Sequence, residues 1–144
     1  MLKEVIIVGA GSFFGGGLRY ALSQTLDKWV TPIMQSAMRP IMRNYFMQDS
    51  YPIPIGTFSV NILGCLTAGF FSGLIFAGGT MPPAVKLFLI AGFCGGFTTF
   101  STFINDNGAM MKEGCLISTA VYMTASLIFG MLALAAGNGL AKLV

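Results

Sequence analysis

The densest group of polar side chains in this sequence lies inside a long apolar stretch, between Gly95 and Thr102. Two adjacent glycines are followed there by hydroxyl residues, among them Thr98 and Thr99. Glycine and hydroxyl residues weaken a helix, and irregular backbone at membrane depth persists only inside protein or along a wet cavity. Carbonyl groups released at such a break can bind a cation. We therefore predict a helix that is broken in this stretch and marks an ion-conducting subunit.

Phe97, Phe100 and Phe103 lie three residues apart around this break, and we expect their rings to stack along one face. A phenylalanine stripe most often serves core packing. The edge of an aromatic ring is electropositive, however, so ring edges can contact an anion without holding it as tightly as a full positive charge does. The stripe is compatible with core packing and with a lining for fast anion passage.

Hydrogen-bond donors follow one face of a later apolar stretch, where Ser118, Tyr122, Ser126 and Gly130 are spaced four residues apart. Side chains at this spacing share a helix face, and each of the hydroxyl groups can donate a hydrogen bond. An anion pathway needs donors, whereas a cation pathway needs carboxylates or carbonyl groups. This stripe therefore favours an anion.

An amide side chain, Asn61, lies in another apolar stretch, on the same helical face as Thr57, Gly64 and Ala68. Polar groups within lipid need partners and tend to face the interior of a helix bundle. Asn61 is equally compatible with an ion pathway and with an interhelical hydrogen bond that only holds the helices together.

Arg19 is the only charged residue between Val5 and Leu22. Its guanidinium group can extend to the membrane interface. It can also provide a positive potential that draws anions toward a vestibule. The sequence leaves both roles open.

The chain that must position these residues has the composition of a membrane protein. Its 144 residues are 55% hydrophobic and 9% charged, whereas soluble domains carry roughly a quarter charged residues. A membrane-spanning helix needs about 20 apolar residues. We predict an all-α membrane protein with one four-helix domain over residues 1–144 and spans near residues 3–25, 54–77, 84–104 and 114–138.

Three connecting features follow from the same pattern. Residues 27–51 are expected to form a surface loop or a short helix on the membrane surface. The polar residues Asn105–Gly108 are expected to end the third span. Pairs of glycines four residues apart predict close helix packing, and these are Gly11 with Gly15 and Gly69 with Gly73.

Several classes of function are disfavoured by composition. The chain has no histidine, and its three cysteines follow no metal or disulfide spacing. Without a nucleophile–base pair or a metal cluster, an enzyme is not expected. No cluster of Lys or Arg indicates nucleic-acid binding. The acidic residues are expected near helix ends or in loops, and they are Glu4, Asp27, Asp49, Asp106 and Glu113.

Three segments together resemble the Fluc (CrcB) fluoride-channel family: Gly17–Tyr20, Gly56–Gly64 and Gly92–Phe103. The order of the segments and the four-span plan match over nearly the whole chain. The resemblance implies a homodimer of two antiparallel subunits, inserted with dual topology in the inner (plasma) membrane of the cell. It further implies passive fluoride export through two pathways per dimer.

The resemblance also implies roles for individual residues. Asn61 would face the pathway, Phe100 and Phe103 would be the paired rings that line it, and Tyr122 with Ser126 would form a polar track. The backbone carbonyls of Gly95 and Thr98 would bind a structural sodium ion on the dimer axis. No organic cofactor is implied. Three departures from the family pattern are a connection after the first span that is longer than in typical members, Asp106, where family members often carry Glu, and Gly130, where a further serine can extend the track.

The leading hypothesis is therefore a fluoride channel in which Arg19 helps to set the entry potential. One rival is a dimeric exporter of the small multidrug type, which also has four helices. Proton-coupled export requires a carboxylate within a membrane span, and none is expected here. A second rival is a helical assembly subunit that transports nothing.

Overall fold

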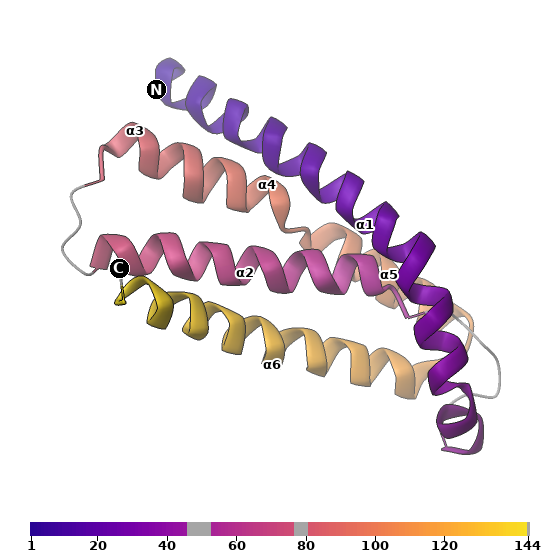
Figure 1. Cartoon of the computed structure of the whole chain (residues 1–144). Helices are drawn as coiled ribbons and strands as arrows, with labels where there is room; N and C mark the ends of the chain where they lie inside the picture. The colour runs from indigo at the N-terminus through magenta and orange to yellow at the C-terminus, as the bar shows by residue number, and fades with distance from the viewer. Residues whose placement is uncertain (46–52, 77–80, 144) are drawn as a thin grey trace.

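A computed structural model describes residues 1–45, 53–76 and 81–143, and the regular elements in these ranges are all helices (Figure 1). Four helical stretches are long and apolar enough to cross a membrane: Leu2–Met34, Ile55–Ile75, Pro83–Lys112 and Leu116–Ala141. The predicted all-α architecture with four spans is confirmed at this level. Residue 77, the predicted limit of the second span, lies outside the described residues.

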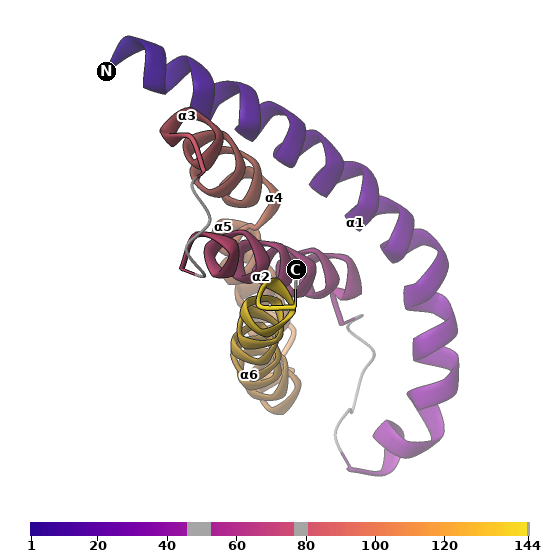
Figure 2. The same ribbon diagram turned by 60° about the vertical axis from the view of Figure 1, so that its left-hand side comes forward.

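Helix α1 spans Leu2–Tyr45 and is much longer than its predicted span. The prediction that this helix ends near residue 25 is wrong, and residues 27–45 continue it instead of forming a separate loop or short helix. Residues 26–31 contain no glycine or proline, and a proline such as Pro32 removes one hydrogen bond and bends a helix without having to end it. Helix α1 is curved, as Figure 2 shows. The rest of the predicted connection, residues 46–51, lies outside the described residues.

Small residues bring α1 against the first part of the third span, as the glycine spacing predicted. A Cβ atom on Gly11 would lie 2.9 Å from Gly92 Cα, and one on Gly15 would lie 2.9 Å from Phe97 N. Real Cβ atoms do not approach other atoms so closely. Only glycine therefore permits this contact, which runs along the upper part of α1 in Figure 1.

Helix α2 (Ile55–Phe76) packs along helix α6 (Leu116–Ala141), and the two lie side by side in Figures 1 and 2. Glycines again permit the approach. A Cβ on Gly73 would lie 3.0 Å from Asn138 Cα, and one on Gly137 would lie 2.7 Å from Phe70 N. The second predicted glycine pair, Gly69 with Gly73, is thus located at a helix contact.

The third span consists of several pieces. It begins with α3 (Pro83–Lys86), continues as the π-helical stretch η1 (Leu87–Cys94) and the short α4 (Gly95–Phe97), and resumes as α5 (Phe100–Lys112). Thr98 and Thr99, between α4 and α5, have extended backbone with φ/ψ of −82°/155° and −145°/109°.

The prediction that Asn105–Gly108 ends this span is also wrong, because α5 runs through these residues to Lys112. Asn107 lies within this helix, and its side-chain Nδ2 donates a hydrogen bond to the carbonyl of Phe103 one turn earlier, at 2.6 Å. The chain turns instead at Gly114, whose φ of 79° suits glycine.

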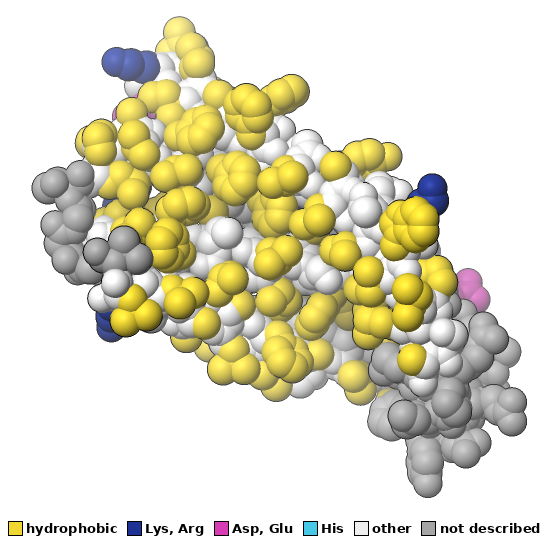
Figure 3. Space-filling view, viewed as in Figure 1, with side chains coloured by type: hydrophobic (Ala, Val, Ile, Leu, Met, Phe, Trp, Pro, Cys, Tyr) yellow, Lys and Arg dark blue, Asp and Glu magenta, His cyan; other side chains and the backbone are white. Residues whose placement is uncertain are grey.

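Hydrophobic side chains cover most of the visible face of the molecule, and the visible charged side chains lie near its ends (Figure 3). Large apolar residues are exposed along α1 and α6 in particular, among them Phe13, Leu18, Leu127 and Met131. A surface of this kind suits lipid better than water.

Candidate functional site

The amide of Asn61, on α2, contacts the backbone at the junction between α4 and α5. Its Oδ1 accepts a hydrogen bond from Thr99 N at 2.7 Å, and its Nδ2 donates to Thr99 O at 3.2 Å. Of the two roles that the sequence left open for Asn61, the one in which it links its helix to a neighbouring segment is therefore present. Both polar groups of the amide are engaged, although Nδ2 carries a second hydrogen that remains able to donate.

This contact changes the hydrogen bonding of the carbonyl of Gly95. In a continuous α-helix, Gly95 O would accept the N–H of Thr99, four residues later. That N–H instead donates to Asn61 Oδ1. Similarly, the N–H of Thr102 would donate to Thr98 O in a continuous helix, but here it donates to Thr99 Oγ1 at 3.3 Å. The two carbonyls predicted to bind sodium have both lost their helical donors.

The rings around the junction form two separate pairs. Phe93 and Phe97 stack with centroids 5.9 Å apart and planes at 10°, whereas Phe100 and Phe103 lie 6.0 Å apart at 36°. The prediction of one stripe through Phe97, Phe100 and Phe103 is wrong. Extended backbone at residues 98 and 99 interrupts the helical register, so that Phe97 is 5% exposed and Phe100 is 74% exposed.

Phe103 links the junction to helix α6. Its ring lies 5.4 Å from the ring of Tyr122, and these two residues form a buried cluster with Met110. Phe58 of α2 adds a further ring, 6.4 Å from Tyr122. The structure thus brings together Phe103 and Tyr122, two residues that lie in different predicted spans.

The hydroxyl stripe on α6 faces the interior of the chain. Ser118 and Tyr122 are buried and Ser126 is half-buried. The hydroxyl oxygens of these three residues are inaccessible and have no hydrogen-bond partner among the described residues. Buried polar groups nearly always have a partner, so this row of donors is suited to a small bound species.

Arg19 is half-buried on α1, and its Nε has no hydrogen-bond partner within the described part of the chain. No described carboxylate forms an ion pair with it, since the ion pair found in these residues joins the N-terminal amine to Glu4. The guanidinium therefore contributes a positive charge that no described acid neutralises at contact distance.

Two carboxylates contribute to this region, although the sequence placed them near helix ends or in loops. Asp27 lies inside α1, and its Oδ1 accepts hydrogen bonds from Gly56 N at 2.8 Å and from Thr31 Oγ1 at 3.3 Å. Asp106 lies inside α5, where the buried side chain of Thr57 provides a hydrogen bond to it. The expectation for these two acids is wrong. Asp49 lies outside the described residues.

The sequence contains one indication that a distant acceptor such as Asp27 is needed at the start of α2. Helix α2 begins at Ile55 after Pro54, so no Ser, Thr, Asp or Asn stands at its start to satisfy the free N–H groups of the first turn. A partner from elsewhere in the chain was therefore required. Its identity depends on how α1 packs, which the sequence does not state.

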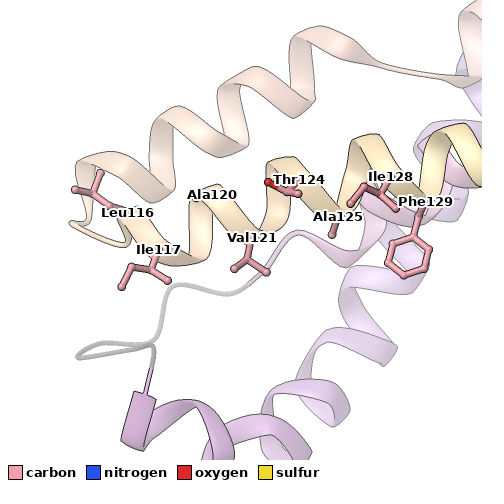
Figure 4. Close-up of a pocket in the computed structure, with 8 residues that line it drawn as sticks. All are labelled: Leu116, Ile117, Ala120, Val121, Thr124, Ala125, Ile128 and Phe129. Atoms are coloured by element: carbon pink, nitrogen blue, oxygen red, sulfur yellow. The ribbon is translucent and has the colours of Figure 1, made fainter.

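A groove of about 600 Å³ runs along α6 (Figure 4), and none of the hydroxyl-stripe residues lines it. Thr124 is the only lining residue with a polar side chain, and the others are Leu116, Ile117, Ala120, Val121, Ala125, Ile128 and Phe129. The groove is therefore suited to an apolar neighbour and not to an ion.

Comparison with known proteins assigns the chain to a family. The family model described as "CrcB-like protein, Camphor Resistance (CrcB)" matches residues 6–138. A protein of Chlorobium phaeobacteroides named "Fluoride-specific ion channel FluC" is 36% identical over 99% of this chain and 98% of its own length. Proteins with the same name from Chlorobaculum tepidum and Bacteroides fragilis are 35% and 33% identical, over 99% and 98% of this chain and 98% of their own lengths.

These relatives are named as ion channels and not as enzymes. The four apolar spans and the family relationship identify a multi-pass membrane protein, as predicted. The resemblance seen in the three sequence segments is confirmed, and the chain belongs to the CrcB family.

Proposed function

We propose that this protein is a passive, fluoride-selective channel that lets fluoride leave the cell. The buried row of donors beside the Phe103 ring, which have no partner among the described residues, carries the proposal. The relatives of this chain are named fluoride-specific channels. Transfer of a small bare anion into apolar surroundings costs tens of kcal/mol by Born estimates. The pathway therefore has to replace the water shell of fluoride step by step.

In this proposal, donors and ring edges share the replacement of water. The hydroxyl groups of Tyr122 and Ser126 donate hydrogen bonds to fluoride, and the edges of the Phe100 and Phe103 rings bridge the dry part of the pathway. The remaining hydrogen of Asn61 Nδ2 is a further donor. Thr57 lines the same path near its end, where its side chain also forms a hydrogen bond with Asp106.

Arg19 acts at a distance in this proposal. Its charge has no described acid partner, so the guanidinium raises the potential felt by an approaching anion. It attracts fluoride to the entrance without binding it in the pathway.

We further propose that Gly95 and Thr98 bind a structural sodium ion through their carbonyls. Sodium prefers oxygen ligands of this kind at breaks in membrane helices. The diversion of the Thr99 and Thr102 N–H groups supports this role, because neither carbonyl receives its helical N–H donor and each can direct a lone pair at a cation. When bound, the ion would hold two junctions together and offset their negative dipoles.

The functional unit is proposed to be an antiparallel homodimer, with each chain forming one domain over residues 1–144. Phe100 is 74% exposed in the single chain although its ring pairs with buried Phe103. A second copy placed against this face would enclose the Phe100 ring and the junction. Two copies related in this way would give two equivalent pathways.

Fluoride efflux from liposomes containing the purified protein tests the function. With potassium fluoride inside and valinomycin present so that potassium can follow, we expect fluoride to leave at a rate far above that of protein-free vesicles; vesicles loaded with potassium chloride should keep their chloride. Equal fluoride release from empty vesicles and from vesicles with folded protein would reject the proposal.

A further inference from the structure

Helices α5 and α6 form an antiparallel hairpin whose register is fixed by two contacts. Near the turn, Cys115 N donates a hydrogen bond to Met110 O at 3.0 Å. Two helical turns away, the ring of Phe103 lies 5.4 Å from the ring of Tyr122. Asn107 is one turn after Phe103 on α5, and Ser118 is one turn before Tyr122 on α6. This register therefore places Asn107 opposite Ser118.

Both of these side chains are buried and hold unused hydrogen-bonding capacity. Asn107 is 4% exposed; its Nδ2 donates to Phe103 O, but its Oδ1 has no partner among the described residues. Ser118 is 2% exposed, and its hydroxyl is likewise without a partner there. Asp106 Oδ2 and the Tyr122 hydroxyl are also buried and have no hydrogen-bond partner among the described residues. Such groups are nearly always satisfied in folded proteins.

The mixture of groups defines what this place can hold. Ser118 and Tyr122 offer donors, which suit an anion, whereas Asn107 Oδ1 and Asp106 Oδ2 are acceptors, which repel a bare anion. A water molecule satisfies both kinds, since it donates one hydrogen to an acceptor and directs the other toward an anion. The matching ligand is a small anion that keeps part of its water shell.

We propose that Asn107 and Ser118 form a rehydration site, one helical turn beyond the Phe103–Tyr122 rings, where fluoride regains water. This proposal rests on the proposed channel function and adds a binding site to the ion pathway. The acceptors hold water in place, and the Ser118 hydroxyl contacts the ion or its water. The step from the ring edges to bulk solvent is thereby divided into two smaller steps.

Thr119 provides a matched control on the same helix. It is 3% exposed, but its hydroxyl donates to the carbonyl of Cys115 at 2.8 Å and is therefore satisfied within α6. A change at Thr119 perturbs the same region of the hairpin without removing a group that faces the proposed site.

The test compares Ser118→Ala, Thr119→Val and the wild-type protein in fluoride efflux from liposomes and in thermal unfolding in detergent. We expect Ser118→Ala to slow efflux about tenfold, with an unchanged or higher melting temperature because the lost hydroxyl has no partner in the part of the chain that the structure describes. Ser118→Cys, which keeps the volume and a weak donor, should lie between alanine and serine. Thr119→Val should transport at the wild-type rate.

Efflux by Ser118→Ala within about twofold of wild type would overturn the site. So would a marked loss of thermal stability in that variant, or an equal loss of efflux in Thr119→Val, because either result would assign the serine to packing of the hairpin. Absence of wild-type efflux would reject the channel function and the site together. Normal wild-type efflux with an inert Ser118→Ala change rejects the site alone.

Discussion

Asn61 and Thr99 form a two-point contact in which one side-chain amide binds both the N–H and the C=O of a single backbone residue. The contact satisfies polar groups that an interrupted helix would otherwise leave unpaired within the membrane. It also draws the Thr99 N–H away from the carbonyl of Gly95. The sequence left two roles open for Asn61; the structure shows the hydrogen-bonding role, and one hydrogen of its amide nitrogen stays able to donate.

Replacement of Asn61 by leucine should lower the free energy of unfolding by about 1–3 kcal/mol, because it leaves a half-buried N–H and C=O of Thr99 without partners. Thermal unfolding in detergent measures this effect. Thr67→Val is the control, because the Thr67 hydroxyl on the same helix donates to carbonyls of its own helix, at 3.1 Å and 3.0 Å, and its contact with the third span is the weak one to Cys94 Sγ at 3.7 Å. Equal stability of the Asn61→Leu and Thr67→Val proteins would show that the Asn61 contact does not support the junction.

Substitutions at two glycines of α1 should have opposite effects. A Cβ on Gly11 would lie 2.9 Å from both Gly92 Cα and Phe93 N, so Gly11→Ala should destabilise the protein by about 1–3 kcal/mol. Gly9→Ala adds its Cβ where no atom lies within 4 Å, and alanine should stabilise the helix there by about 0.5–1 kcal/mol. Melting temperatures of both variants check the packing of α1; a stabilised Gly11→Ala protein would contradict it.

Removal of the Asp27 carboxylate should weaken the start of α2. The Asp27→Ala variant leaves Gly56 N without its 2.8 Å acceptor, and a lost acceptor at a helix N-terminus costs about 0.5–2 kcal/mol. Asp27→Asn retains a side-chain carbonyl and should recover most of this stability. Unfolding curves of the three proteins provide the measurement, and an Asn variant as unstable as the Ala variant would argue against this role.

Loss of the aromatic edges should slow fluoride specifically. Phe100→Ile and Phe103→Ile keep apolar bulk but remove the electropositive ring edge, and each should reduce fluoride efflux more than tenfold by removing more than about 1.4 kcal/mol of stabilisation along the path. Phe13→Ile, at an exposed ring on α1, is the control. Unchanged efflux in both test variants, measured with an ion-selective electrode, would reject the role of the ring edges.

Much of the architecture follows from hydrophobic length alone. The four spans and the glycine pairs were predictable because lipid requires long apolar helices and because only glycine permits backbones to approach closely. The ends of the helices were less predictable. Asn107 satisfies its amide nitrogen on its own helix and is buried, so a sequence of polar residues did not mark a turn.

Features that depend on tertiary partners were not readable from spacing. The three-residue interval of Phe97, Phe100 and Phe103 assumed one helix, whereas extended residues 98 and 99 divide the rings into two pairs. Asp27 and Gly56 are 29 residues apart in sequence, and only the packing of α1 on α2 brings them into contact. The sequence singled out Asn61 and Tyr122 because polar groups are rare in apolar membrane helices and tend to face the interior of the bundle.

The most direct test of the channel function is electrogenic fluoride efflux. Liposomes loaded with potassium fluoride and containing the purified protein should release fluoride when valinomycin lets potassium follow. They should release little before that, because an anion that crosses without a counter-ion builds up a membrane potential. The rate should not depend on a proton gradient. Release that occurs only with a proton gradient would contradict a passive channel and favour a coupled exporter that uses Asp27 or Asp106; no release beyond protein-free vesicles would contradict fluoride transport itself.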